Sequence, residues 1–298
     1  MHAAKLSVMT VLVTGASGVA GRATVLLLRE RGYNVKMADA SAPPAELRDL
    51  GEFVRCDTRT PADCREAVRG CDAIVHLAAW HCAHVPPVSD DTIWAVNTDG
   101  TYNIMQAGRE FGVKAFVYAS SMAYGHGGVY SLTKVVGEEM ARGYHYMTGA
   151  GVTMLRYHDF VPKSYLAFGE KLLRNGVDAR DVASSNVASV EAALRGGLGV
   201  FRTIVHTNHG MPADVVANFR DLGPDWCESQ LPGARHLIRK YKFDLPSRVE
   251  QHDMSEAEEK LGWTPKHNFL EFLRDLQIRD ERGDDVSALW APGLLPTL

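Results

Sequence analysis

Thr10-Val-Leu-Val-Thr14 is followed directly by Gly15-Ala-Ser-Gly18-Val-Ala-Gly21, and these twelve residues are the strongest local signal for the fold class. Its first five residues are a short apolar and β-branched run without alternation, which predicts a strand buried on both faces of a parallel sheet. The run Arg22–Arg31 has a helical pattern, and Gly32 is placed to cap its C-terminus. The chain therefore opens with a strand, a glycine turn and a helix.

The glycine turn predicts an anion site. Free N–H groups and the positive end of the dipole at a helix N-terminus would face a pyrophosphate. Gly15 would permit the tight turn, Gly18 would let the backbone approach phosphates, and Gly21 would let helix and strand pack closely. A glycine-rich turn without a ligand is the alternative interpretation.

Strands and helices continue to alternate along the chain. A doubly wound parallel sheet of the Rossmann type, an α/β fold, is the architecture that this order predicts. We expect a dinucleotide-binding domain over residues 1–160 and a smaller, mainly substrate-binding lobe over 161–298, with some elements returning to the sheet. The further elements predicted are strands at Asn34–Ala38, Glu52–Cys56, Asp72–Ala79, Ala115–Ala119, Val152–Tyr157 and Phe201–His206, and helices at Pro61–Arg69, Asp91–Phe111, Tyr130–Tyr146, Asp178–Arg195 and Ala213–Phe219.

Asp39 follows the second predicted strand. Its place beyond Gly21 suits the carboxylate that accepts hydrogen bonds from an adenosine ribose diol. A carboxylate there repels a 2′-phosphate, and no arginine or lysine follows before Arg48, so NAD is favoured over NADP. A solvated aspartate in a loop is the alternative.

Tyr130 and Lys134 stand four residues apart on a predicted helix, so their side chains share one face. An ammonium near a phenol stabilises the phenolate and lowers the tyrosine pKa from its reference of about 10. The tyrosine then becomes usable as a proton acceptor near neutral pH. Ser120-Ser121, at the end of the preceding strand, could hold a substrate oxygen.

Composition limits the possible classes of protein. The 298 residues are 46% hydrophobic and 23% charged, as in an ordinary globular protein. A net charge of −4 gives no reason to expect nucleic acid or an anionic membrane as a partner. No apolar run has the length of a membrane span, and the N-terminus lacks a signal-peptide pattern. Five cysteines without a Cys-x-x-Cys pair suggest reduced thiols and a cytoplasmic location.

Taken together, these motifs resemble the extended short-chain dehydrogenases/reductases, the NAD-dependent epimerase/dehydratase family. The resemblance covers about residues 9 to 276. It is carried by Thr14-Gly-Ala-Ser-Gly-Val-Ala-Gly21, Cys56-Asp57, His76-Leu-Ala-Ala79, Val96-Asn-Thr-Asp-Gly-Thr-Tyr-Asn103, Tyr118-Ala-Ser-Ser121 with Tyr124-Gly125, Leu155-Arg-Tyr-His-Asp159, Asp181-Val-Ala183 and Leu261-Gly-Trp-Thr-Pro265.

The resemblance implies roles for individual residues. Tyr130 would be the catalytic acid/base, Lys134 would depress its pKa, and Ser121 would bind the reacting hydroxyl, with Ser120 as the alternative serine. Tyr157 would lie beside the nicotinamide. The residues implied to contact NAD are Gly15, Ser17, Gly18, Val19, Ala20, Gly21, Asp39, Asp57, Thr58, Leu77, Ala78, Ala79, Asn97, Ala119, Tyr130, Lys134 and Tyr157.

Two segments are shorter than is usual in the family, residues 122–129 and the stretch between Pro162 and Val177. Less protein is then available to hold a nucleoside diphosphate, which favours a small sugar, sugar acid or polyol as substrate. Hexuronate dehydrogenases are the most similar subtype. Lys171, with Arg174 beside it, falls near the basic residue that meets the substrate carboxylate there, although both could be solvated helix charges.

Further substrate contacts are expected from Trp80 and His81, which follow the fourth strand, and from Asp159, which stands where relatives often place an asparagine. His81, Cys82 and His84 could be read as metal ligands. Their spacing matches no standard zinc pattern and the expected chemistry needs no metal, so we predict no metal site.

Three functions remain open. The first is an NAD-dependent dehydrogenase of a small sugar or sugar acid. The second is a nucleotide-sugar epimerase or dehydratase that keeps NAD bound, and the third is a dinucleotide-binding sensor without chemistry. The resemblance also implies a homodimer formed through the helices at 91–111 and 130–146.

Overall fold

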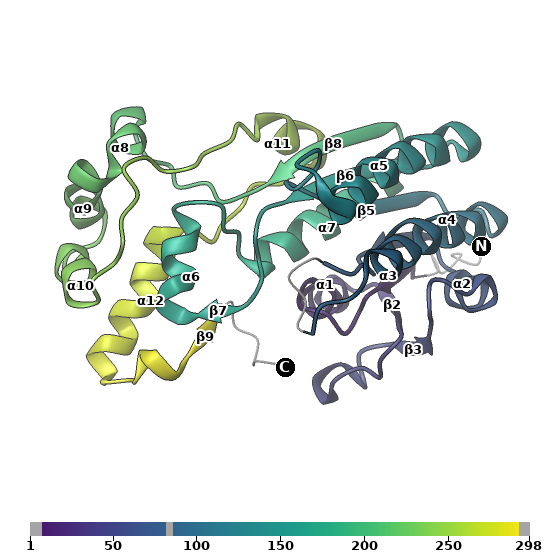
Figure 1. Cartoon of the computed structure of the whole chain (residues 1–298), viewed down its shortest axis with the longest axis horizontal. Helices are drawn as coiled ribbons and strands as arrows, with labels where there is room; N and C mark the ends of the chain where they lie inside the picture. Colours follow the sequence, from purple (N-terminus) through teal and green to yellow (C-terminus); the bar gives the residue numbers. More distant parts are fainter. Residues whose placement is uncertain (1–7, 82–85, 292–298) are drawn as a thin grey trace, which may run out of the picture. The chain divides into compact units, whose positions relative to one another are not determined.

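The computed structural model describes residues 8–81 and 86–291 (Figure 1). The chain forms two compact units. The first contains the described residues up to Arg156, together with Ala183–Thr203 and Glu256–Trp263. The second contains Tyr157–Val182, Ile204–Ser255 and the described residues from Thr264 onward. The chain therefore passes between the units several times.

A seven-stranded sheet has the strand order β3-β2-β1-β4-β5-β6-β8. The pairs β1–β2, β1–β4, β2–β3 and β4–β5 are all parallel, with Val13 opposite Met37 on one side and Val75 on the other. This order reverses direction at β1, as in a doubly wound sheet, so the predicted fold class is confirmed. The strands are β1 (Thr10–Thr14), β2 (Asn34–Asp39), β3 (Glu52–Arg55), β4 (Ala73–His76), β5 (Ala115–Ser121), β6 (Gly151–Tyr157) and β8 (Val200–Val205).

Helices cover both faces of this sheet. On one face, α2 packs on α4 and α4 packs on α5, over a core that includes Leu12, Ile74 and Tyr144. On the other face, α1 contacts β1 and β2, and Asn186 of α7 donates a hydrogen bond of 3.0 Å to Thr24 of α1. The helices that contribute to this unit are α1 (Val19–Glu30), α2 (Pro61–Val68), α3 (Asp90–Trp94), α4 (Gly100–Glu110), α5 (Gly128–Thr148), α7 (Ala179–Arg195) and α11 (Ser255–Leu261).

Burial explains why β1 reads as a continuous apolar run. Successive side chains point to opposite faces, and Val11, Leu12 and Val13 all have no exposed surface. Both faces of this central strand therefore lie against helices, which removes the alternation expected for a half-exposed strand.

The close approach of α5 to β5 depends on Gly137. A Cβ atom at this position would lie 1.8 Å from the hydroxyl oxygen of Tyr118, which no side chain can tolerate. The Tyr118 hydroxyl in turn donates to the backbone carbonyl of Thr133 at 3.5 Å. This packing fixes the N-terminal half of α5 against the end of β5.

The second unit is mainly helical and has an aromatic core that includes Phe219, Phe269 and Phe272. Asn268 caps α12 by accepting hydrogen bonds from the N–H groups of Leu270 and Glu271. Its elements are α6 (Tyr165–Leu172), α8 (Ala213–Ala217), α9 (Phe219–Gln230), α10 (Ala234–Lys240), α12 (Phe269–Arg282) and the antiparallel pair β7 (Lys163–Ser164) and β9 (Trp290–Ala291).

The single helix predicted over Asp91–Phe111 is three segments in the structure: α3, a π-helical turn at Ala95–Asp99, and α4. Inserted π turns are frequent at functional sites, because they redirect side chains. In the parts of the chain that the structure describes, every helix is too short or too polar to cross a lipid bilayer.

Candidate active site in the first unit

The loop after β1 has the geometry of a phosphate cradle. Gly15 adopts a φ of +66°, and a Cβ there would lie 2.8 Å from the backbone nitrogen of Ala78. A Cβ on Gly21 would lie 2.1 Å from the carbonyl oxygen of Gly15. Among the described side chains none caps the N-terminus of α1, so the first N–H groups of the helix are left for an anion. These residues fit the pyrophosphate of a dinucleotide.

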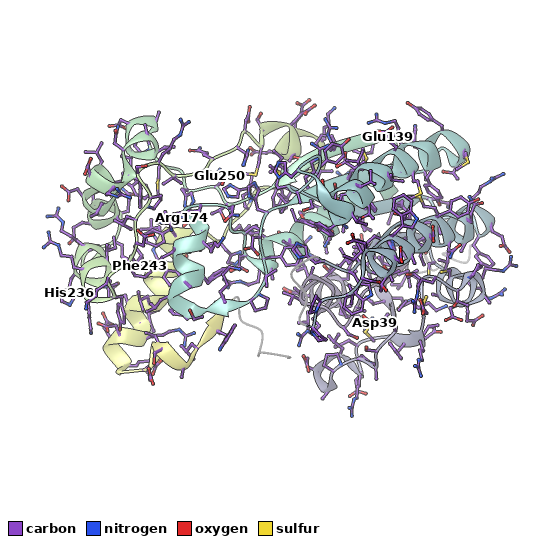
Figure 2. All side chains as sticks on the ribbon, in the orientation of Figure 1. Asp39, Glu139, Arg174, His236, Phe243 and Glu250 are labelled. Atoms are coloured by element: carbon purple, nitrogen blue, oxygen red, sulfur yellow. The ribbon has the colours of Figure 1, made fainter. Side chains whose placement is uncertain are left out.

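Asp39 joins this loop to the end of β2. Its carboxylate accepts hydrogen bonds from the backbone N–H groups of Ser17 and Ser41, both at 2.9 Å. The side chain, labelled in Figure 2, is only partly buried. A carboxylate has about four acceptor positions, so two accepted bonds leave capacity for a ribose diol.

A chain of hydrogen bonds runs across the ends of β1 and β4. The Thr101 hydroxyl donates to the Asn97 carbonyl at 2.6 Å, so it accepts from Nε2 of His76 at 2.9 Å. Nδ1 of His76 then accepts from the Thr14 hydroxyl at 2.8 Å, and the Thr14 oxygen accepts from the N–H of Ala78 at 3.2 Å. Each polar atom in this chain has a partner.

His76 stays neutral inside this arrangement. Burial, followed by the charge of Lys134, lowers the pKa of His76 to about 3. Each hydrogen bond between Thr101, His76 and Thr14 therefore keeps the same donor and acceptor at neutral pH. It holds the backbone after β4 in place, where Leu77, Ala78 and Ala79 were predicted to contact the cofactor.

Asn97, in the π-helical turn, holds the segment after β4 to α5. Its Oδ1 accepts from the N–H of Trp80 at 2.8 Å, and its Nδ2 donates to the Trp80 carbonyl at 2.9 Å. The same Nδ2 lies 3.1 Å from the Thr133 hydroxyl oxygen. Asn97 therefore fixes the backbone of Trp80, a predicted site residue, and links it to the side chain of Thr133 on α5.

Tyr130 and Lys134 lie together on α5, as their spacing predicts. The Lys134 ammonium is 5.4 Å from the centre of the Tyr130 ring and donates to the Ala119 carbonyl at 2.8 Å. Burial lowers the pKa of Lys134 to about 8. The His81 ring packs edge-on against Tyr130, with ring centres 4.5 Å apart. A buried cation thus lies beside the tyrosine.

The two candidate serines have different environments. The Ser120 hydroxyl donates to Oε1 of Glu138 at 2.5 Å and is buried. The Ser121 hydroxyl oxygen accepts from the N–H of Ala123 at 3.0 Å, and its hydrogen remains available for another acceptor. Glu138 is also held by Arg156 at 2.7 Å, so Ser120 belongs to an internal network.

The predicted site residues divide between the two units. The first unit contains Gly15, Ser17, Gly18, Val19, Ala20, Gly21, Asp39, Asp57, Thr58, Leu77, Ala78, Ala79, Trp80, His81, Asn97, Ala119, Ser121, Tyr130 and Lys134, and the second contains Tyr157, Asp159, Lys171 and Arg174. In the first unit, β1, β2, β4 and β5 are parallel, so their ends bring these segments to one edge of the sheet.

In the second unit, the two basic residues that were predicted to contact substrate, Lys171 and Arg174, already have partners within the protein. Nζ of Lys171 donates to the Asn175 side chain at 2.8 Å and lies 3.6 Å from Asp159. Arg174 forms an ion pair with Asp244 at 2.7 Å. Burial alone would raise the pKa of Asp159, but hydrogen bonds led by that from Lys163 bring it below its ordinary value. Asp159 is therefore ionised at neutral pH.

The remaining predicted residues are Asp57 and the possible metal ligands near His81. Asp57 accepts from Arg59 at 2.6 Å, which lowers the pKa of its carboxyl despite partial burial. Cys82 and His84, which were weighed with His81 as metal ligands, lie outside the described residues.

Thr14, Thr101 and Thr133 were not predicted as site residues. Thr14 ends a strand directly before the glycine turn, which is the one local signal that singles it out.

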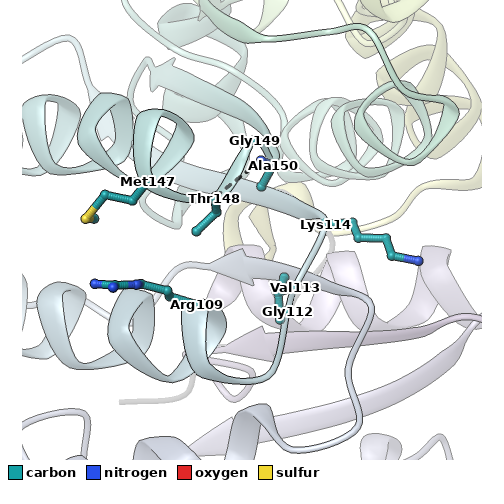
Figure 3. A pocket seen from close by; sticks show the side chains of 8 residues that line it. All are labelled: Arg109, Gly112, Val113, Lys114, Met147, Thr148, Gly149 and Ala150. Carbon is teal, nitrogen blue, oxygen red and sulfur yellow. Dashed lines mark hydrogen bonds between the residues drawn. The ribbon is translucent and has the colours of Figure 1, made fainter.

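A cavity of about 230 Å³ lies at the opposite edge of the sheet (Figure 3). Figure 3 shows Arg109 of α4 and Met147 of α5 pointing the same way from its two sides. The cavity is lined by the helix ends and the residues that lead into β5 and β6: Arg109, Gly112, Val113, Lys114, Met147, Thr148, Gly149 and Ala150. It is therefore separate from Lys134 and Tyr130 on α5 and from the glycine loop after β1.

Comparison with known proteins identifies the family of this chain. The model of the NAD dependent epimerase/dehydratase family matches residues 11–172. A 3-beta-hydroxysteroid dehydrogenase of Mycolicibacterium neoaurum is 33% identical over 155 residues, which are 45% of this chain and 42% of that protein. The aligned region spans less than half the length of this curated relative.

Solved structures show the same fold. A UDP-glucose 4-epimerase of Thermotoga maritima has a TM-score of 0.66 at 21% identity, over 92% of this chain and 99% of that one. A mutated uronate dehydrogenase has a TM-score of 0.62 at 19% identity, over 93% and 87%. Because the family model matches more than half of the sequence, the chain belongs to the NAD-dependent epimerase/dehydratase family, whose members are enzymes of the short-chain dehydrogenase/reductase superfamily with NAD as their cofactor.

Proposed function

We propose that this protein is an NAD-dependent oxidoreductase that transfers a hydride at a carbinol carbon of a small sugar, sugar acid or related polyol. The observation that carries the proposal is the buried ammonium of Lys134, 5.4 Å from the Tyr130 ring. A cation held there stabilises a tyrosinate, which is the base that alcohol oxidation requires.

In the proposed reaction Oη of Tyr130 takes the proton of the substrate hydroxyl. Ser121 donates a hydrogen bond to the substrate oxygen and holds it in line with Tyr130. NAD, when bound, supplies the nicotinamide ring that accepts the hydride from the carbinol carbon. The Ala119 carbonyl holds Lys134 in place throughout, so the cation does not have to be repositioned in each turnover.

For the cofactor, we propose that the backbone of Gly15–Gly21 holds the pyrophosphate, while Asp39 accepts from the adenosine ribose. The charge of Asp39 opposes a 2′-phosphate and favours NAD over NADP. The hydrogen bonds of Asn97 to Trp80, and those that run from Thr101 through His76 to Thr14, would hold the backbone on the nicotinamide side of the site in place.

The proposed size of the substrate rests on the sequence. Residues 122–129 leave a short connection between β5 and the catalytic tyrosine, which limits how much protein can enclose a nucleoside diphosphate. The ionised state of Asp159 supports hydrogen bonding to sugar hydroxyls. Lys171 and Arg174 would have to exchange their present partners to bind a substrate carboxylate.

The test is formation of NADH by the purified protein with NAD and a panel of free aldoses, uronic acids, polyols and 3β-hydroxysteroids. Turnover of a small polyol or uronic acid, with little turnover when NADP replaces NAD, is the expected result. The steroids are included because the curated relative is a 3-beta-hydroxysteroid dehydrogenase. A strong steroid signal and none with sugars would overturn the proposed substrate class while preserving the chemistry.

Two other functions have distinct signatures. An epimerase or dehydratase would retain NAD through purification and change a nucleotide sugar without net NADH. This alternative is favoured by the fold match to the UDP-glucose 4-epimerase over 99% of that chain. A dinucleotide sensor would bind NAD and turn over none of these substrates.

We also propose a homodimer in the cytoplasm. Exposed large apolar side chains lie on the helices expected to form the dimer: Trp94 on α3, Tyr102 on α4, and Leu132 on α5. The described cysteines Cys56, Cys64, Cys71 and Cys227 are free thiols, which supports a reducing compartment.

A further inference from the structure

Three histidines from distant parts of the sequence meet inside the second unit. His158 follows β6, His206 follows β8, and His252 lies in the segment before α11. Each offers one ring nitrogen such that the three nitrogens lie within 4.8 Å of one another. His158 and His206 are buried, and His252 is partly buried. The proposed hydride transfer uses none of these side chains.

A carboxylate completes the group. Oε1 of Glu250 lies 3.2 Å from Nε2 of His252 and 3.8 Å from Nε2 of His158, and the two Nε2 atoms are 2.9 Å apart. Glu250 is labelled in Figure 2, as is Arg174. Two nitrogens and one oxygen thus form a small triangle of electron-pair donors.

The size of this triangle suits a metal ion. A point equidistant from corners 2.9, 3.2 and 3.8 Å apart lies about 2.0 Å from each of them, which is the length of a bond from Zn²⁺ to imidazole nitrogen or carboxylate oxygen. Hydrogen bonds alone account less well for the arrangement. His252 Nε2 has either one proton or one lone pair, yet it faces both a carboxylate oxygen and a second imidazole nitrogen.

His206 presents a lone pair of its own. Its Nε2 lies 2.9 Å from the carbonyl oxygen of Arg174, which can only accept, so Nε2 carries the proton. Nδ1 is then unprotonated, and it is buried without a hydrogen-bond partner. A histidine that donates one N–H to a backbone carbonyl and leaves the other nitrogen open has the usual arrangement of a metal ligand.

We propose that His158, His206, His252 and Glu250 bind one divalent transition-metal ion of the zinc class. Imidazole nitrogens select such ions over Mg²⁺ and Ca²⁺, which prefer oxygen. With three nitrogens and one carboxylate the four positions of a tetrahedral ion are filled, so the role of the ion is structural. It would join the segments after β6 and β8 to the segment before α11 within the second unit.

The proposal departs from the sequence prediction of no metal site, which considered only the ligand spacing near His81. Ligands at positions 158, 206, 250 and 252 have no short spacing that a sequence pattern could reveal.

The test uses protein without an affinity tag, stripped with a chelator and then loaded separately with Zn²⁺ and Co²⁺. We expect one ion per chain by elemental analysis, a visible Co²⁺ spectrum of tetrahedral type, and a higher melting temperature with metal. Loss of an outer partner alone typically weakens metal binding by about 10–100-fold, so His206→Gln and His252→Gln should each weaken it by at least about 100-fold.

His209 supplies the matched control. It is also buried in the second unit, its Nε2 lies 2.9 Å from the Leu172 carbonyl, and its Nδ1 has no partner, but it is not part of the cluster. His209→Gln should therefore keep the ion. If His206→Gln does not fold, His252→Gln and Glu250→Gln decide the question, because both side chains are partly exposed.

Wild-type protein that holds no stoichiometric ion after loading would overturn the proposal. Binding that survives in His252→Gln and Glu250→Gln as in the His209→Gln control would also overturn it, since the ion would then be held elsewhere. Neither result depends on catalytic activity, so failure of the metal site and failure of the proposed function remain distinguishable.

Discussion

The hydroxyl of Ser120 donates a hydrogen bond to Oε1 of Glu138 at 2.5 Å, from the end of β5 to the middle of α5. Glu138 has no exposed surface and also accepts two hydrogen bonds from Arg156. Ser120 therefore serves the packing of α5 against the sheet. This pairing favours Ser121 as the serine that meets the substrate.

Replacement of each serine should separate the two roles. Ser121→Ala should lower kcat by roughly 100-fold or more, as does loss of a hydrogen-bond donor aimed at a reacting oxygen. Ser120→Ala should leave kcat within a few-fold of wild type. It should lower the free energy of unfolding by about 1–3 kcal/mol, because the buried carboxylate of Glu138 loses the hydrogen bond that Ser120 donates. Steady-state kinetics and denaturant unfolding of both variants check this. The reverse pattern would assign the catalytic role to Ser120.

Tyr130→Phe should reduce kcat by about 100- to 10,000-fold, because it removes the proposed acid/base and leaves the ring in place. NAD affinity, measured by fluorescence or calorimetry, should change little. Tyr124→Phe is the control, since the Tyr124 ring packs on Arg156 in the same unit. Activity that survives in Tyr130→Phe would show that another group moves the proton.

Lys134→Met should abolish turnover without loss of stability. Burial lowers the pKa of Lys134 from 10.5 to about 8, so at pH 7 the folded protein carries a buried charge at a cost of up to about 3 kcal/mol. Between pH 8 and 10.5 the unfolded chain binds a proton that the folded chain lacks, so wild-type stability rises with pH across this window.

Denaturant unfolding at several pH values tests this linkage. The variant should be the more stable protein at pH 7, and its advantage should shrink as the pH rises above 8. A difference that does not vary with pH would mean that Lys134 titrates normally in the folded protein.

Asp39→Asn should weaken the preference for NAD. The change removes the negative charge that opposes a 2′-phosphate, and hydrogen bonds to charged groups contribute about 1.5–3 kcal/mol. The ratio of kcat/KM for NAD to that for NADP should therefore fall by roughly 10- to 100-fold. Asp49→Asn, an exposed aspartate of the same unit, should leave the ratio unchanged. An unchanged ratio in Asp39→Asn would remove Asp39 from cofactor selection.

Tyr102→Arg should produce a monomer if α4 lies in a dimer interface. Tyr102 is 54% exposed, and a charge introduced into an apolar contact would be buried without a partner. Ile278→Arg is a suitable control, because Ile278 is 47% exposed on α12. Analytical ultracentrifugation of both variants gives the answer. A wild-type protein that sediments as a monomer would contradict the dimer itself.

Features that depend on short-range order could be predicted from the sequence. The strand Thr10–Thr14 has its predicted bounds, and the glycine turn after it follows from local backbone geometry. Tyr130 and Lys134 share a face because a helix repeats every 3.6 residues. These features depend on residues close together in the chain.

The contacts between residues far apart in the sequence became visible with the folded chain. Ser120 pairs with Glu138, Asn97 holds Trp80, and His158 lies against His252 through contacts between separate elements. In the second unit, α6, α9, α10 and α12 were not among the predicted helices, and α9 includes Pro224 in its interior, where proline disfavours a helix. These elements are stabilised by a shared aromatic core, and burial against distant residues outweighs local propensity.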